Sequence, residues 1–262
     1  SGSPFRNDEM SRNSTLKYHA QVTLEPFTEL RIEIMANKNY IQNHSEFFRN
    51  CDTLGQSFLH QVPRDLGSYT VSYMSIKTLF DNDKDQLIEK FKGFEETRKV
   101  ISQRQGTGTH AKDGADYTAG YGRYQQDVLV PAFLAAYTGA TPNEVSLDVF
   151  KTKVRPNWQV SYNGLNKLPW FSDMLASFNL THGYKSTITI NSYQTNIDYL
   201  DFDPVSPQNI NPLSQNYYSR FDIPNVINNE SFSPLIGVDL KTRNNISIRF
   251  DMAITRNLAL NL

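Results

Sequence analysis

Apolar and polar residues alternate with a period of two over long stretches, and this alternation constrains the fold more than any other feature. Between residues 16 and 24 every second side chain is apolar, and residues 30–36 follow the same rule. Pro26-Phe27-Thr28-Glu29 separates the two stretches. Because side chains along a β-strand point alternately to opposite faces, the pattern predicts a hairpin with one apolar and one polar face. Each arm has about 9–11 residues, the length that a tilted strand needs to cross a bilayer.

The C-terminal end repeats the pattern at greater length. Residues 236–240 alternate, Thr242-Arg243-Asn244-Asn245 turns the chain, and the seventeen residues from Ile246 to Leu262 alternate with one interruption at Arg256. A strand of that length spans about 55 Å, whereas a bilayer core is about 30 Å thick. Strands of ordinary globular proteins have about 3–10 residues.

The middle of the chain predicts further strands and one helical insert. We expect strands at 158–162 and 178–190, a less regular one at 69–80, and a long ordered loop at 196–234. Helical spacing predicts helices at 85–103 and 127–137, the second ending at Gly139, and a capping box predicts a short third helix beginning at Thr141-Pro142-Asn143-Glu144. The expected organisation is therefore a β wall at 1–80, a helical and loop insert at 81–157, and a second β wall at 158–262.

Composition excludes several classes of protein. The chain of 262 residues has 26 basic and 27 acidic residues and a net charge of −1, which gives no electrostatic case for binding nucleic acid. The longest apolar run, Val128 to Tyr137, is interrupted by Pro131 and is shorter than the roughly 20 residues of a membrane helix. The sequence thus argues against an α-helical membrane protein. It permits a membrane β-barrel, whose strands are only half apolar.

Motifs for catalysis or metal binding do not emerge. Cys51 is the single cysteine and has no metal-type spacing, so we expect it to be inert. His19 and His182 fall in strand patterns, and we expect loops at the remaining histidines, His44, His60 and His110.

Other short patterns have ordinary explanations. Gly106-Thr107-Gly108 lacks the spacing of a phosphate loop, and the N-x-S/T sites at Asn13, Asn179 and Asn245 fit chance at this composition. The sequence therefore predicts a protein that is not an enzyme, with no catalytic, metal-binding or cofactor-binding residue.

Aromatic residues cluster around one predicted connection. Trp158, Tyr162, Trp170 and Phe171 flank residues 163–169. In a barrel such residues form the belts at the membrane interfaces. In a soluble β-sandwich they would form the edge of a core, and the sequence leaves both interpretations open.

Several segments resemble the SprA/Sov family of Bacteroidetes outer-membrane proteins, in matching order over nearly the whole chain. The most specific is the segment 126–139, which reads QDVLVPAFLAAYTG. The other similar segments are 23–32, 45–48, 94–98, 156–165, 182–184 and 232–238.

The resemblance implies the fold and the function. It implies that the chain is a segment, toward the C-terminal part, of the very large outer-membrane β-barrel of the type IX secretion system, which also serves gliding motility. Folded cargo proteins pass through the lumen of that barrel and leave by a lateral opening. The implied partners are the remainder of the same barrel, outer-membrane lipid, a PorV-type shuttle barrel, a plug protein and the secreted cargo. The family is not catalytic and has no known cofactor, so no site residue carries over.

Some features fit this expectation and others leave it open. The first residues, Ser1-Gly2-Ser3, are unlike a signal peptide, and Leu262 lies within an unfinished strand pattern, so we expect a fragment of something larger. Counting seven strands puts the turns at 26–29 and 242–245 on opposite sides, whereas barrels usually keep short turns on one side. The alternatives are a soluble all-β binding or adhesion module of a bacterial cell-surface protein and, on a similar scaffold, a glycan hydrolase.

Overall fold

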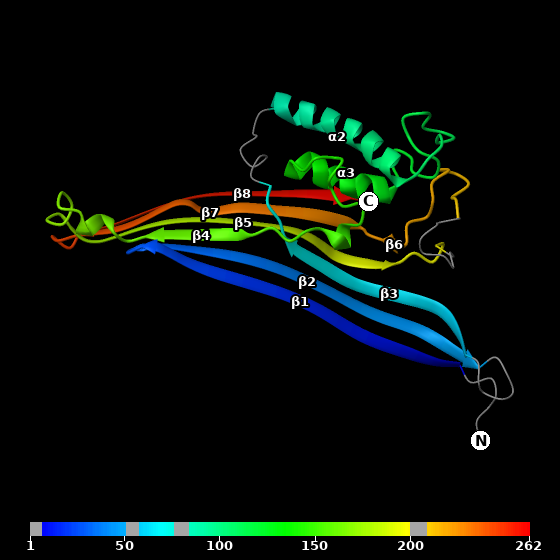
Figure 1. Cartoon of the computed structure of the whole chain (residues 1–262), viewed down its shortest axis with the longest axis horizontal. Helices are drawn as coiled ribbons and strands as arrows, with labels where there is room; N and C mark the ends of the chain where they lie inside the picture. Colours follow the sequence, from blue (N-terminus) through cyan, green and yellow to red (C-terminus); the bar gives the residue numbers. More distant parts are fainter. Residues whose placement is uncertain (1–6, 51–57, 76–83, 200–208) are drawn as a thin grey trace, which may run out of the picture.

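A computed structural model describes residues 7–50, 58–75, 84–199 and 209–262. In this part of the chain, eight strands form one antiparallel sheet, with the main path β1-β2-β3-β5-β7-β8 (Figure 1). The predicted mainly β class is thus confirmed. The strands are β1 (Asn7–Phe27), β2 (Leu30–Asn50), β3 (Phe58–Ser72), β4 (Asn157–Tyr162), β5 (Leu175–Thr195), β6 (Phe221–Asp222), β7 (Asn225–Thr242) and β8 (Ser247–Asn261).

The first two strands are longer than the alternation alone indicates. β1 and β2 have 21 residues each, so each spans about 70 Å. Their register is regular from Asn7 opposite Arg49 to Leu24 opposite Ile32. The turn between them places Glu29 at a positive φ of 77°.

Strands β3 and β4 occupy the same place in the sheet, between β2 and β5. Val71 of β3 lies opposite Lys38 of β2, and Asn157 of β4 lies opposite Met35, so β4 continues the line of β3. The chain leaves the sheet at this break and returns to it after residues 73–156, which we call the insert. Strand β3 ends at Ser72, so the strand expected at 69–80 is wrong for residues 73–75. Residues 76–80 lie outside the described part. The Ser72 hydroxyl accepts a hydrogen bond from the Asn37 backbone at 2.8 Å, which helps to hold the chain at the break.

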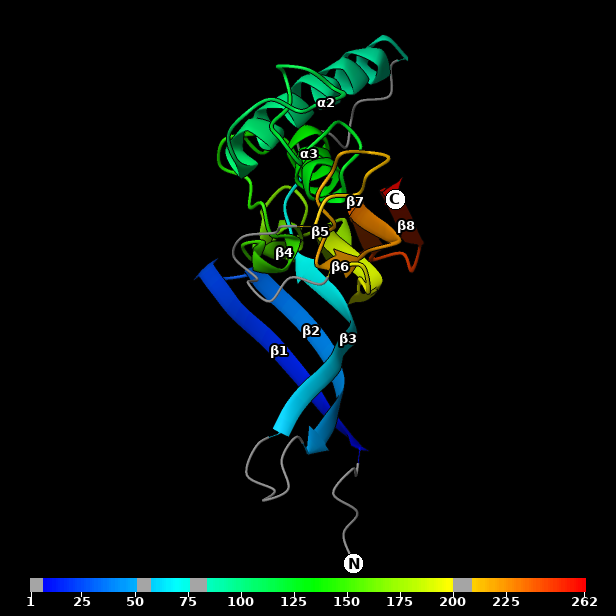
Figure 2. The same ribbon diagram turned by 90° about the vertical axis from the view of Figure 1, so that its right-hand side faces the viewer.

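The insert contains the two expected helices, α2 (Lys84–Gln105) and α3 (Gln126–Thr138), stacked on one side of the sheet (Figure 2). Gln125 caps α3 through its side chain, and Gly139 ends it with a φ of 69°. Pro131 within α3 cannot donate to the carbonyl of Asp127. The side chain of Gln105 donates to that carbonyl instead, at 2.9 Å, and so joins α2 to α3.

The predicted third helix is wrong. The segment that begins at Thr141 forms a single turn, in which the amides of Glu144 and Val145 both donate to the Thr141 carbonyl. The guanidinium of Arg104 donates to the carbonyls of Pro142 and Val145, at 2.5 and 3.0 Å, and therefore occupies acceptors that further helical turns would need. The Thr141 hydroxyl bonds to the Glu144 carboxylate rather than to the backbone amide of a capping box.

The predicted loop at 196–234 is wrong from residue 225 onward, because β7 begins at Asn225. Alternate residues from Val226 to Phe232 are buried beneath the insert. Two of them, Asn228 and Glu230, are polar, so this half of the strand lacks the apolar alternation by which strands were recognised.

The short turns lie at the same end of the sheet. Leu30 lies opposite Tyr162, which lies opposite Leu180, and Leu180 lies opposite Val238 near the turn that leads into β8. The count of seven strands, which put these turns on opposite sides, is wrong because β3 and β4 together act as one strand. The long connection from β5 to β7 lies at the other end. Within the described residues, no helix has the length and apolar character needed to cross a bilayer.

Candidate membrane-facing surface

One face of the sheet carries a continuous apolar band between the short turns and the insert. The cross-strand pairs Val22–Ile34, Leu180–Val238 and others place its members side by side from β1 to β8. The apolar band comprises Ala20, Val22, Leu24, Leu30, Ile32, Ile34, Ala36, Val160, Tyr162, Phe178, Leu180, Ile236, Val238, Leu240, Ile248, Phe250, Met252 and Ile254.

Many of these side chains are bare. Phe250 is 55% exposed and Ile248 is 51% exposed. Together with Val22 and Leu24 on β1, at the other edge of the sheet, they form an exposed apolar surface that crosses all the long strands on one face. Soluble monomers rarely expose a contiguous apolar surface wider than a few hundred Å², so a surface of this kind marks a site of contact with a protein partner or with a membrane.

The insert covers the continuation of the same face. Along β2, Ile34 of the band and Tyr40 lie six residues apart in a regular strand and therefore share a face. The Tyr40 ring packs against Phe150 of the insert at 5.6 Å and Tyr69 at 6.1 Å. The insert thus lies on the apolar side of the sheet.

Beneath the insert, the face becomes a dry core. Val71, Ile188 and Ile190 of the sheet are fully buried against Val128 and Leu134 of α3. Packing against the sheet thus buries the apolar side of α3.

A polar row separates the band from this core. Ser186, Glu230 and Arg256 are cross-strand neighbours on β5, β7 and β8. Glu230 is buried and accepts a hydrogen bond from the Tyr184 hydroxyl at 2.8 Å. We call these three residues the border row, because the band ends and the insert begins there.

Aromatic rings mark both limits of the band. At the border row, Trp158 and Tyr184 stack at 4.5 Å. Near the short turns, Phe27 meets Tyr162 edge-on at 6.5 Å, and Trp170 is 88% exposed in the connection from β4 to β5. Amphipathic rings at the two margins of an apolar band are typical of strands that cross a membrane.

The opposite face is polar. The Arg249 guanidinium lies 2.6 Å from Asp251 and 3.7 Å from Asp239 on the neighbouring strand. His19 and Asn37, which are cross-strand partners, form a side-chain hydrogen bond of 2.6 Å. These exposed pairs contribute little stability, but they make a surface that is compatible with water.

The structure groups one set of titratable residues that sequence reasoning missed. His44 lies in β2 rather than in the expected loop, and its Nδ1 lies 2.8 Å from Asp65 while its Nε2 lies 3.4 Å from Glu46. Cross-strand pairing brings His44 and Asp65 together, so no local sequence motif indicates the group. The Thr195 hydroxyl of β5 accepts the Asp65 amide at 2.7 Å, so the group joins β2, β3 and β5.

His19, His110 and His182 also have hydrogen-bond partners. His19 and His182 lie in strands as predicted, and His60 lies in β3, so its expected loop position is wrong. His110 lies in a loop as expected, where its Nδ1 accepts the amide of Asp113 at 3.0 Å and its Nε2 bonds to Asn216 at 3.1 Å.

Neither a metal site nor a phosphate loop is present in the described residues. No group of three His, Cys, Asp or Glu side chains there is placed to hold a metal ion. Gly106 and Gly108 follow α2 rather than a strand, and Cys51 lies outside the described part. Burial raises the pKa of the Asp127 carboxyl and raises the pKa of Tyr121 to about 12, and both residues line a cavity of 310 Å³ between the insert and the connection from β5 to β7.

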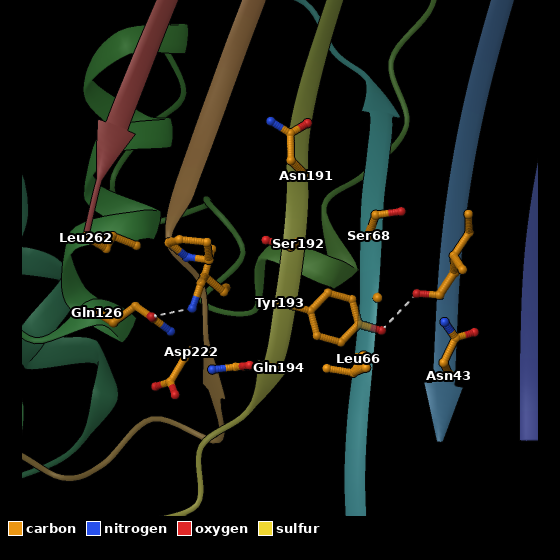
Figure 3. A pocket seen from close by; sticks show the side chains of 14 residues that line it. Asn43, Leu66, Ser68, Gln126, Asn191, Ser192, Tyr193, Gln194, Asp222 and Leu262 are labelled. Carbon is orange, nitrogen blue, oxygen red and sulfur yellow. Dashed lines mark hydrogen bonds between the residues drawn. The ribbon is translucent and has the colours of Figure 1, made fainter. Parts of the chain in front are cut away.

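A cavity of 780 Å³ lies toward the far end of the sheet, over the paired ends of β3 and β5 (Figure 3). Its polar lining is largely amide and hydroxyl, from residues such as Asn43, Ser68 and Gln194. Tyr193 closes one side, with its hydroxyl donating to the Ile41 carbonyl at 3.1 Å (Figure 3). Asp222 is the one carboxylate in the described lining, so no pair of acids converges there for glycan hydrolysis.

Comparison with known proteins does not assign the chain to a family. None of the models of known protein families matches the chain, and no curated protein is similar to it in sequence.

Proposed function

We propose that the chain forms part of the wall of a large outer-membrane β-barrel that conducts folded proteins, as the resemblance to the SprA/Sov family implies. The observation that carries this proposal is the bare apolar band on one face of a sheet whose opposite face is polar. A barrel wall needs both faces at once, because one meets lipid and the other meets a water-filled lumen.

The dimensions of the band support the proposal. From Ile248 to Ile254 on β8, and from Leu30 to Ala36 on β2, the band covers about 20 Å along the strands, and the aromatic margins extend it. Transmembrane barrels carry an apolar band about 25 Å tall. The strands themselves are much longer than the band, which leaves room for the insert beyond the membrane.

The edges of the sheet also support the proposal. Within the described residues, β1 pairs with β2 alone and β8 pairs with β7 alone. Long unpaired edges invite pairing with further strands. In the proposed barrel these further strands belong to the remainder of the same wall.

An orientation follows from the loops. Barrels keep short turns on the periplasmic side and long connections on the cell surface. The end with the short turns is then periplasmic, and the insert lies outside the barrel wall near the cell surface. The family resemblance alone implies the partners, which are a PorV-type shuttle, a plug protein and secreted cargo.

Reconstitution tests the membrane assignment directly. The full chain should aggregate in buffer without detergent and should stay in solution in detergent or lipid nanodiscs, which cover the apolar band, as judged by size-exclusion chromatography with light scattering. A soluble adhesion module would instead be folded and monomeric in plain buffer, which would defeat the proposal.

A genetic experiment tests the transport function. Deletion of residues 236–262 in the organism that makes the protein removes one hairpin of the wall, and a barrel cannot keep its closure without it. We expect many cargo proteins to accumulate in the periplasm together, measured by proteomics of the medium and the periplasm. Normal secretion with loss of one enzymatic activity would revive the hydrolase alternative.

A further inference from the structure

A basic cavity lies where the insert meets the apolar band. Its volume is 450 Å³, and its walls come from the turn after α3 and from residues 151–155. Lys151, Lys153 and Arg155 line it together with the Tyr73 ring. Arg104 and Glu144 also line the cavity, so four cations and one carboxylate surround it.

The local backbone explains why these cations face the cavity. Residues 152–155 belong to no helix or strand, and their side chains alternate between core and solvent. Thr152 is buried and donates to the Val149 carbonyl at 2.6 Å, and Val154 packs against the core. The alternation therefore turns Lys151, Lys153 and Arg155 outward on the same side.

Two of these charges are not neutralised by the protein. Lys151 lies 3.5 Å from Asp148. In the described part of the chain, no carboxylate lies within ion-pair distance of Lys153 or Arg155. The Arg155 guanidinium lies over the Tyr73 ring at 5.7 Å, which holds it in place without cancelling its charge.

The height of the cavity relative to the band identifies the ligand. The amide of Arg155 donates to the Ser72 carbonyl, and the amide of Tyr73 donates to the carbonyl of Ser186, each at 3.0 Å. Ser186 belongs to the border row. The floor of the cavity is therefore level with the upper limit of the apolar band, where hydrocarbon would give way to headgroups in the proposed wall.

We propose that this cavity binds the phosphate of an anionic membrane lipid whose acyl chains lie on the apolar band. Lysine and arginine donate charge-assisted hydrogen bonds to phosphate oxygens. The inference rests on the proposed function, because the band must face lipid for a headgroup to arrive at this height.

Lipid retention in nanodiscs tests the inference. The full chain is reconstituted in discs of phosphatidylcholine with a minor fraction of phosphatidylglycerol, extracted in mild detergent, and analysed for co-purifying lipid by mass spectrometry. We expect enrichment of phosphatidylglycerol over the disc composition. The double variant Lys153→Gln/Arg155→Gln should weaken phosphatidylglycerol binding by about 25-fold, since each cation near an anionic surface contributes about fivefold.

A matched control distinguishes binding in the cavity from a general effect of net charge. Lys17 and Lys185 are exposed on the polar face at nearby heights, so Lys17→Gln/Lys185→Gln makes the same change in net charge on the other side. This control should retain the enrichment. Equal loss in both double variants would overturn the proposed site.

The remaining outcomes decide whether the cavity binds the phosphate of a lipid or a free phosphate ion. Binding of inorganic phosphate to the detergent-solubilised chain, lost in Lys153→Gln/Arg155→Gln and equal in strength to lipid binding, would assign the cavity to a free anion and overturn the lipid proposal. Retention of lipid without preference for phosphatidylglycerol would overturn the site and leave the membrane wall standing. A chain that retains no lipid of any kind would instead contradict the proposed function.

Discussion

One face of the sheet has two halves that are built from similar side chains but meet different surroundings. Near the short turns, Ile248 and Phe250 are more than half exposed, whereas on the same face beneath the insert, Ile188 and Ile190 are fully buried. The difference does not come from hydrophobicity, which is alike in both halves. It comes from the chain itself, which leaves the sheet at Ser72 and covers one half with α2 and α3. The bare half has to find its covering elsewhere, and we propose that lipid provides it.

The largest expected effect comes from truncating the covered half. Ile188→Ala should lower the free energy of unfolding by about 2–5 kcal/mol, because the packed insert cannot collapse fully into the space left behind. The measurement is a urea titration in lipid, followed by the fluorescence of Trp158 and Trp170.

The matched change in the bare half is Ile248→Ala. It should cost about 1 kcal/mol, because acyl chains fill the space and only part of the side chain was covered. Equal costs at the two positions would mean that protein covers both halves, as in a self-associating soluble module.

The second comparison sets the band against the polar face. Met252 lies near the middle of the band, and replacing it with arginine should cost about 2–4 kcal/mol in lipid. Ala253, its neighbour, points to the opposite face, so Ala253→Arg should be tolerated. Ile248→Arg should cost less than Met252→Arg, because Ile248 lies nearer the short turns. Titrations in vesicles measure all three, and a polar-face variant as harmful as Met252→Arg would remove the distinction between lumen and lipid.

The two halves also differ in what could be predicted from sequence. In the bare half, apolar residues alternate with polar ones because each face meets a different solvent, so β8 and the first hairpin follow directly from the pattern. In the covered half, the face beneath the insert includes Asn228 and Glu230. Glu230 accepts a hydrogen bond from the Tyr184 hydroxyl and the Asn228 side-chain amide donates to the Ser75 hydroxyl, and both partners are distant in sequence. Because the alternation is broken there, the sequence predicts a loop over the first half of β7.

The point of insertion was similarly hidden. The break between β3 and β4 depends on the hydrogen bond of the Ser72 hydroxyl with the Asn37 backbone and on the return of Asn157 to the same line. No glycine or proline marks the point where the chain leaves at Ser72. The error in strand count and in the sides of the turns followed from this single feature. The absence of a catalytic or cofactor residue stays a prediction.

The smallest expected effect concerns the junction between α3 and the connection to β7. Asp127 accepts hydrogen bonds from the Gln125 side chain at 2.9 Å and from the Ser219 hydroxyl at 3.0 Å, yet burial raises the pKa of its carboxyl above the usual value. A raised pKa in the folded state means that the contribution to stability is fully present below the unfolded pKa and is lost as the pH rises through the folded pKa. The free energy of unfolding of the insert should therefore fall as the pH rises through that window. Asp127→Asn keeps an oxygen for both donors, so it should raise stability at neutral pH and flatten this pH dependence. Hydrogen exchange of the α3 amides across the acid range measures both effects, and an unchanged pH profile in the variant would show that another group is responsible.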